Sequence, residues 1–278
     1  MKNLIYSIFI GLLLISCKPE TNKPEPIAAT AVAPVKAVPV KKVLADAATI
    51  LARKQVPILC YHHIQEIGPN DSAYKKEYTV TPANFADQMK ALSDGGYHTI
   101  LPEQLKEYLA DGTPLPEKPV MLTFDDTDGE QYTIGAKEMN KYGFKGVFFI
   151  MTVSINRPNY MTKEQLIELS NTGHGIEAHT WDHHMVTKYS GDDWKLQLEK
   201  PKKKLEDIVG KPVRYFAYPF GLWNQAAIPE LKSRGYELGF ILSSKRDTID
   251  PMFTIRRMLV TGTWSTAGMI RSMDSTFK

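Results

Sequence analysis

Residues 120–126 read VMLTFDD, an apolar run that ends in two adjacent carboxylates. Short runs of this kind, without polar alternation, are typical of strands buried on both faces. Similar runs lie at residues 56–61, 146–151, 176–178, 215–218 and 237–242, and helix-like segments separate them. Strands that alternate with helices predict parallel strands joined by helical crossovers, and therefore a barrel or an open α/β sheet.

Capping residues mark some of the helices between these runs. Thr81 can cap a helix whose first residue is Pro82, a position where proline is tolerated. A longer helix is predicted over residues 192–209, with a bend at Pro201, and a short one over residues 43–54.

Length and composition limit the classes of protein to consider. The chain has 278 residues, 43% of them hydrophobic and 23% charged, with a net charge of only +3. No basic run is interleaved with aromatic residues, which argues against nucleic acid as a partner. Without an internal repeat or a second break in composition, we expect one catalytic domain over residues 56–278, acting as a monomer.

The first 55 residues have a different character. A positive start, an apolar stretch at residues 8–15 and Cys17 resemble a bacterial lipoprotein signal, so residues 1–16 are predicted to be a signal peptide. A plain signal peptide or a membrane anchor, with Cys17 incidental, is the alternative. Residues 17–55 are rich in Pro, Ala and Lys and predict an extended stalk. We therefore expect an exported protein with a lipid on Cys17, anchored to the bacterial envelope in the periplasm or at the surface. The other cysteine, Cys60, is expected to be buried and inert.

Three polar clusters each follow a strand-like run, and in α/β barrels the carboxyl ends of the strands build the active site. The first is Asp125-Asp126, where two neighbouring carboxylates repel one another unless a cation or a donor offsets the repulsion. A solvated helix cap is one explanation. A glycosidase fits poorly, because its carboxylates lie roughly 5 Å or more apart on either side of the bond. Metal binding by one carboxylate and proton transfer by the other is the better use.

The second cluster is HTWDHH at residues 179–184. The spacing of four between His179 and His183 can place both imidazoles on one side of a turn, as metal sites require. Taken alone, such a pair is more often surface or core histidine, but the preceding strand favours ligands. His184 has no assigned role, and His98 and His174, beside turn glycines, are expected to be structural.

The third cluster is RYFAYPFG at residues 214–221. Its aromatic density would be core packing in most proteins. The Pro219 and Gly221 at the strand end, however, force the chain out of the strand and expose backbone donors.

Taken together, the three clusters resemble the polysaccharide deacetylase family, also called the NodB-homology family or family 4 carbohydrate esterases. The matching segments are TFDD at 123–126, HTWDH at 179–183 and residues 214–221, in the family's order, and the resemblance spans about residues 56–263. It implies a distorted (β/α) barrel with a single catalytic domain.

The resemblance also implies a role for each residue. Asp126, His179 and His183 would bind one divalent metal ion, usually zinc. Asp125 would be the catalytic base, Arg214 would orient it, and the backbone N–H of Tyr218 would help to stabilise the oxyanion. These roles agree with metal-assisted hydrolysis, in which the metal activates water and polarises the carbonyl.

The sequence departs from the family pattern at two points. Thr127-Asp128-Gly129 follows Asp126 where many members have Gly-Tyr, and the late Leu-x-His that supplies the general acid is missing. The segment LCYHH at residues 59–63 instead resembles the poly-β-1,6-N-acetylglucosamine deacetylases, whose histidine comes early in the chain. His62 is therefore the predicted general acid, with His63 structural or on the rim. A core histidine is the alternative for His62.

The resulting prediction is a hydrolase of carbon–nitrogen bonds other than peptide bonds, which removes N-acetyl groups from an N-acetylglucosamine-containing polysaccharide. Its partners would be this polysaccharide and, through Cys17, the membrane. An O-acetyl esterase on xylan or peptidoglycan and a non-catalytic glycan-binding lipoprotein are the alternatives. Trp181, Trp223 and Trp264 are candidate sugar-stacking surfaces, although core packing would explain some of them.

Overall fold

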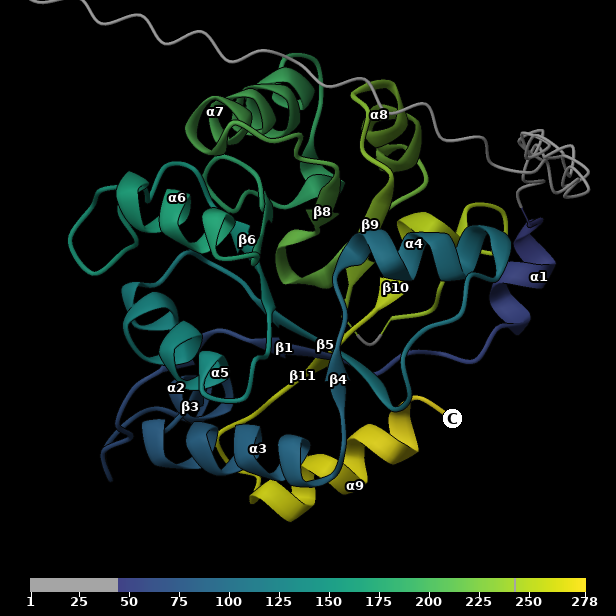
Figure 1. Cartoon of the computed structure of the whole chain (residues 1–278). Helices are drawn as coiled ribbons and strands as arrows, with labels where there is room; N and C mark the ends of the chain where they lie inside the picture. Colours follow the sequence, from purple (N-terminus) through teal and green to yellow (C-terminus); the bar gives the residue numbers. More distant parts are fainter. Residues whose placement is uncertain (1–44, 243) are drawn as a thin grey trace, which may run out of the picture. The chain divides into compact units, whose positions relative to one another are not determined.

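Parallel strands with helices around them form the framework of the protein (Figure 1). The computed structural model describes residues 45–242 and 244–278, and these belong to one compact unit. The predicted signal peptide at 1–16 and most of the predicted stalk at 17–55 lie outside the described residues.

The strands of the main sheet are short and mostly buried. In sheet order they are β10 (Ile255–Arg256), β9 (Leu238–Ile241), β8 (Tyr215–Ala217), β7 (Gly175–Ala178), β6 (Gly146–Ile150), β5 (Pro119–Phe124), β1 (Ile58–Tyr61) and β11 (Met258–Leu259), while β4 (His98–Thr99) pairs with the start of β5. All of these neighbours are parallel, as the alternation of strands and helices predicts. A small separate sheet pairs β2 (His63–Ile64) with β3 (Thr79–Val80).

The last strand segment brings the two ends of the sheet together. Only Arg257 separates β10, which pairs with β9, from β11, which pairs with β1. The Arg257 N–H donates to the Ile241 carbonyl (3.1 Å) on one side, and the Val260 N–H donates to the Cys60 carbonyl (2.9 Å) on the other. The sheet is therefore nearly closed, which confirms the predicted distorted (β/α) barrel with a single domain.

Helices surround this barrel (Figure 1). They are α1 (Ala47–Ala52), α2 (Ala73–Tyr78), α3 (Pro82–Asp94), α4 (Pro102–Asp111), α5 (Lys137–Asn140), α6 (Lys163–Asn171), α7 (Lys200–Val209), α8 (Ala227–Ser233) and α9 (Thr266–Thr276). The Thr81 cap is confirmed, because its hydroxyl accepts from the Asn84 N–H (3.2 Å). In the part of the chain that the structure describes, no helix combines the length and apolarity needed to cross a bilayer.

Two predicted helices differ in detail from the observed ones. The helix expected over residues 43–54 begins later and ends earlier, as α1. The helix expected over residues 192–209 is divided, because a π-helical turn at Lys195–Glu199 precedes α7. Pro201 lies in the first turn of α7, where its missing N–H leaves no hydrogen bond unmade.

Alternate strand residues contribute to two apolar clusters. One contains Phe124 and Phe148, whose rings stack with centroids 4.9 Å apart, together with the helices on that face. The other contains Phe149 and Phe240 from the opposite faces of their strands. The Arg257 guanidinium lies 5.2 Å from the centre of the Phe149 ring, so the second cluster is on the same side of the sheet as this arginine. This side of the sheet is mostly apolar, but it also carries the buried Glu177, the register partner of Phe149, whose carboxylate accepts from the Arg214 and Tyr215 N–H groups (3.0 and 2.8 Å).

Replacement of Phe148 by alanine tests the apolar cluster that contains Phe124 and Phe148. The ring is fully buried between β5 and the covering helices, so Phe148→Ala is expected to lower the free energy of unfolding by roughly 3–5 kcal/mol, measured by urea denaturation. Phe148→Leu, which keeps most of the volume, should cost clearly less. Equal losses for the two variants would contradict this account of the packing.

Candidate metal centre and catalytic groups

The polar clusters predicted from the sequence meet at the carboxyl ends of the strands. His62 follows β1, Asp125 and Asp126 follow β5, and His179 follows β7. The Asp125 N–H donates to the Tyr61 carbonyl (3.0 Å), so the ends of β1 and β5 lie at the same level. This end of a parallel barrel is where active sites form.

Asp126, His179 and His183 converge on one point. The Nε2 atoms of His179 and His183 each lie 3.4 Å from Oδ1 of Asp126, and the three candidate ligand atoms lie within 4.8 Å of one another. Ligands about 2.0–2.1 Å from a tetrahedral ion are separated by roughly 3.3 Å, which agrees with these distances.

Unsatisfied atoms in this group also favour a metal ion. Among the described residues, Asp126 Oδ1 and His179 Nε2 are buried and have no hydrogen-bond partner. Burying a polar atom without a partner costs about 1–3 kcal/mol, and more for a charged group. A divalent cation coordinated by both atoms would remove this cost. The three residues therefore fit a metal site.

Backbone and neighbouring groups hold the two histidines in place. His179 Nδ1 lies 2.8 Å from the Ala217 carbonyl, so this nitrogen donates and Nε2 is left as the ligand atom. The His183 N–H donates to the Thr180 hydroxyl (2.9 Å). Asp126, Thr180 and His183 all have positive φ values of 76°, 68° and 67°, which side-chain-bearing residues rarely adopt. Such strain is typical of functional sites.

The protonation of these groups suits metal binding. Burial, and next the neighbouring His179, lower the pKa of His183 to about 4, so its imidazole is neutral at pH 7. Burial alone would raise the pKa of Asp126, but the surrounding histidines, His179 first, outweigh it and lower the pKa well below the usual range. Asp126 is therefore ionised.

Asp125 is held by a buried arginine. Arg257 donates from Nη1 to Oδ1 and from Nη2 to Oδ2 of Asp125, both at 2.7 Å, and Arg257 is only 1% exposed. Arg257 also donates to the Thr123 hydroxyl (3.2 Å). Burial alone would raise the pKa of Asp125, but Arg257, and then His179, lower it to about 2. The carboxylate is thus charged and fixed in orientation, as a base must be.

The prediction that Arg214 orients Asp125 is wrong. Arg214 directly precedes β8, at the amino end of the sheet, whereas the site lies at the carboxyl ends. Its side chain is 43% exposed, and its Nε lies 3.6 Å from Oε1 of Glu237. Arg257, from the last strand segment, takes the position that the resemblance assigned to Arg214.

The prediction for the Tyr218 N–H is also wrong. This N–H donates to the Phe240 carbonyl (3.0 Å) and so continues the pairing of β8 with β9. Two residues later, Phe220 has a φ of 59°, and no described residue accepts from its N–H. The Phe220 ring lies 4.3 Å from the His183 ring, so the turn is next to the metal ligands. Gly221 is required there, because a Cβ would lie 2.5 Å from the Leu242 nitrogen.

His62 lies in the site, beside Asp125. It is 8% exposed, and its Nδ1 has no hydrogen-bond partner among the described residues. A nitrogen of His62 and a carboxylate oxygen of Asp125 are within 4.8 Å of each other, together with the Cys60 sulfur. Burial lowers the pKa of His62, although Asp126 and Asp125 oppose this effect. Cys60 is buried, as predicted, and burial raises the pKa of its thiol.

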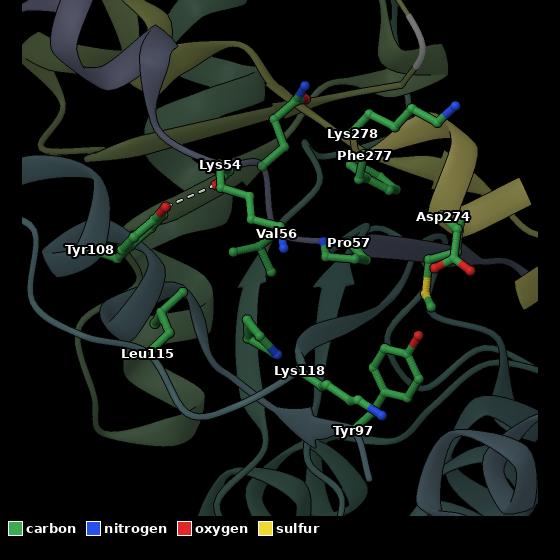
Figure 2. Close-up of a pocket in the computed structure, with 13 residues that line it drawn as sticks. Lys54, Val56, Pro57, Tyr97, Tyr108, Leu115, Lys118, Asp274, Phe277 and Lys278 are labelled. Atoms are coloured by element: carbon green, nitrogen blue, oxygen red, sulfur yellow. Dashed lines mark hydrogen bonds between the residues drawn. The ribbon is translucent and has the colours of Figure 1, made fainter. Parts of the chain in front are cut away.

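A pocket lined by aromatic, aliphatic and lysine side chains lies at the opposite end of the barrel (Figure 2). It is lined by residues 54–57, which precede β1, by Tyr97, Lys118 and Phe277, and by further residues from the adjoining segments. Tyr108 donates to the Lys54 carbonyl (3.0 Å) at its edge. None of the predicted catalytic or metal-binding residues lines this pocket.

Loss of the guanidinium tests the pairing of Arg257 with Asp125. Arg257→Gln leaves a buried carboxylate without its counter-charge and should lower the free energy of unfolding by roughly 3–5 kcal/mol, measured by urea denaturation. Arg214→Gln, the matched control, removes an exposed guanidinium and should cost less than about 1 kcal/mol. If the Arg214 variant were the less stable of the two, the assignment would fail.

Known proteins resemble this chain in sequence and in fold. The sequence model described as polysaccharide deacetylase matches residues 112–239. YxkH of Bacillus subtilis is 29% identical, over 86% of each chain. The poly-beta-1,6-N-acetyl-D-glucosamine N-deacetylase of Staphylococcus epidermidis is 30% identical, over 73% of this chain and 78% of the relative. The deacetylase PplD of Streptococcus pyogenes shares the fold, with a TM-score of 0.72 at 23% identity, covering 79% of this chain and 98% of that one. The chain therefore belongs to the polysaccharide deacetylase family and is a hydrolase of carbon–nitrogen bonds.

Proposed function

We propose that the protein is a metal-dependent enzyme that removes N-acetyl groups from an N-acetylglucosamine-containing polysaccharide, with zinc as the metal. The observation that carries the proposal is the convergence of Asp126, His179 and His183 beside the ionised carboxylate of Asp125. One carboxylate thus faces two imidazoles, while the other is paired with a guanidinium.

Each group has a distinct task in the proposed reaction. A bound zinc ion would supply Lewis acidity, which polarises the carbonyl and makes water a nucleophile near neutral pH. Asp125 accepts a proton from the attacking water, and Arg257 keeps the carboxylate in position. The Phe220 N–H, free of other acceptors among the described residues, donates to the developing oxyanion. Such a donor contributes commonly about 3 kcal/mol to the transition state.

His62 completes the reaction as the proposed general acid. His62 directly follows β1, and one of its ring nitrogens lies within 4.8 Å of a carboxylate oxygen of Asp125. Protonated His62 gives a proton to the leaving nitrogen, so that acetate and a free amine result. Because burial lowers its pKa, the protonated imidazole is a stronger acid than a solvated one.

The choice of an N-acetylated glucosamine polymer rests on sequence similarity. The Staphylococcus epidermidis relative is named for N-deacetylation of poly-beta-1,6-N-acetyl-D-glucosamine, and its match covers 73% of this chain. Trp181, 38% exposed on the loop between the two histidine ligands, is the proposed sugar-stacking surface. Trp223 and Trp264 pack against the core and are less suited to that role.

We also propose that the protein is exported and anchored through a lipid on Cys17, as a monomer in the bacterial envelope. The support comes from the sequence of residues 1–17 and the Pro-rich segment that follows. At the domain end of this segment, the Ala45 N–H donates to the Ala110 carbonyl (2.7 Å) near the end of α4.

Replacement of the base tests the reaction. Asp125→Asn should retain bound zinc but lower acetate release from β-1,6-linked N-acetylglucosamine oligomers by roughly 100- to 10,000-fold. Asp87→Asn, on the exposed face of α3, is the control and should keep full activity. A chelator should stop the wild-type enzyme, and full activity of metal-free protein would end the proposal. Turnover on acetylxylan alone would indicate an O-acetyl esterase, and glycan binding without any turnover would indicate a binding protein.

The anchor is tested separately from the chemistry. Cys17→Ala is expected to move the protein from the membrane fraction to the soluble fraction of cells, with acetate release unchanged, because lipidation requires that thiol. Cys60→Ala should remain in the membrane fraction, since Cys60 is buried in β1. Retention of the Cys17 variant in the membrane would show that the attachment has another cause.

A further inference from the structure

A second cluster of metal-ligating side chains lies outside the groups assigned above. It consists of His63 on β2 and Asp128 and Glu130 in the segment that follows Asp126. His63 Nδ1 is 3.2 Å from Asp128 Oδ2 and 3.6 Å from Glu130 Oε1, and the three candidate ligand atoms lie within 4.8 Å of one another. The sequence alone places His63 only as a structural or rim residue.

The contacts of His63 Nδ1 with the two carboxylates do not meet the geometry of hydrogen bonds. His63 Nδ1 and Asp128 Oδ2 are both buried and, among the described residues, neither has a hydrogen-bond partner despite their short separation. Asp128 as a whole is only 7% exposed. A nitrogen and an oxygen that approach closely without aligning N–H to O are arranged as two ligands of one ion would be. The distances also match the roughly 3.3 Å expected between ligands of a tetrahedral ion.

The Asp126, His179 and His183 group provides an internal comparison. There too, nitrogen–oxygen distances of 3.4 Å coincide with buried atoms that lack partners, Asp126 Oδ1 and His179 Nε2. The two clusters thus share the same signature, although they use different residues.

The charge of the second cluster also favours a cation, because two carboxylates face one imidazole. In the described part of the chain, no lysine or arginine forms an ion pair with Asp128 or Glu130. Gln65 donates from Nε2 to Glu130 Oε1 (2.5 Å) and so holds that carboxylate toward His63. A divalent ion would balance the charge of the two carboxylates.

We propose that His63, Asp128 and Glu130 bind a second divalent cation of the zinc or manganese type, separate from the ion of the catalytic site. One imidazole and two carboxylates form a ligand set suited to such borderline ions. The side chain of His63 is 34% exposed, which leaves room for water to complete the coordination. The ion would tie β2, directly after His62, to the loop that begins at Asp126, and so stiffen the rim of the site.

Metal stoichiometry tests this proposal without reference to activity. Chelator-stripped full-length protein is titrated with Zn²⁺ by calorimetry, and the metal content is measured by mass spectrometry after desalting. Wild-type protein should bind about two zinc ions per chain, and Asp128→Asn and Asp126→Asn about one each, because each variant removes a ligand from one cluster. His184→Ala, an exposed histidine outside both clusters, is the control and should bind about two.

Two results would overturn the second site: two zinc ions in the Asp128 variant, or none in the Asp126 variant. Near-ultraviolet circular dichroism establishes that each variant is folded. If Asp128→Asn does not fold, His63→Gln takes its place with the same expected stoichiometry. Since the Asp126 variant removes only the catalytic ion, failure of the proposed catalytic site and failure of the second site give different counts.

Discussion

The buried pairing of Arg257 with Asp125 is the interaction on which the arrangement of the site depends. Both side chains are removed from water, and two parallel hydrogen bonds of 2.7 Å join them. A buried carboxylate without a partner would cost several kcal/mol and would take up a proton instead. The arginine therefore allows a charged aspartate to persist inside an apolar barrel, beside a second aspartate.

That second aspartate is stabilised in another way, and the difference separates the functions of two adjacent residues. Asp125 faces a fixed guanidinium, which neutralises its charge and fixes its direction. Asp126, with a φ of 76°, turns toward the two imidazoles. The repulsion expected between neighbouring carboxylates is thus offset by different groups on each side. One carboxylate is suited to exchange protons and the other to coordinate a metal.

Much of the fold and of the metal centre could be predicted from the sequence because both depend on local patterns. Apolar runs followed by polar residues mark the carboxyl ends of parallel strands, which meet at one edge whatever their order. The clusters that contain Asp126, His179 and His183 follow from this pattern, while their roles as ligands follow from the family resemblance. Arg214 and Tyr218 were misassigned because a motif does not state which end of a strand each residue occupies. Arg214 precedes β8, and the Tyr218 N–H belongs to the β-ladder.

The sequence indicates an inward-facing arginine in the last strand segment, but it does not indicate which carboxylate this arginine contacts. Within IRRML at residues 255–259, alternation must point one arginine inward, and an inward arginine needs a carboxylate. Which carboxylate it meets depends on barrel closure, since β10 pairs with β9 and β11 with β1. The approach of His63 to Asp128 is equally a product of tertiary structure, because 64 intervening residues separate them in the chain.

Closure by the segment around Arg257 has a consequence for folding. The partner of Asp125 comes from the last strand segment in chain order, whereas the strand that this segment joins, β1, is the first of the sheet. Contacts between such distant parts of a sequence slow folding, because the loop between them must be closed first. The same step that closes the barrel therefore also supplies the guanidinium to Asp125, so the carboxylate gains its partner only when the sheet is complete.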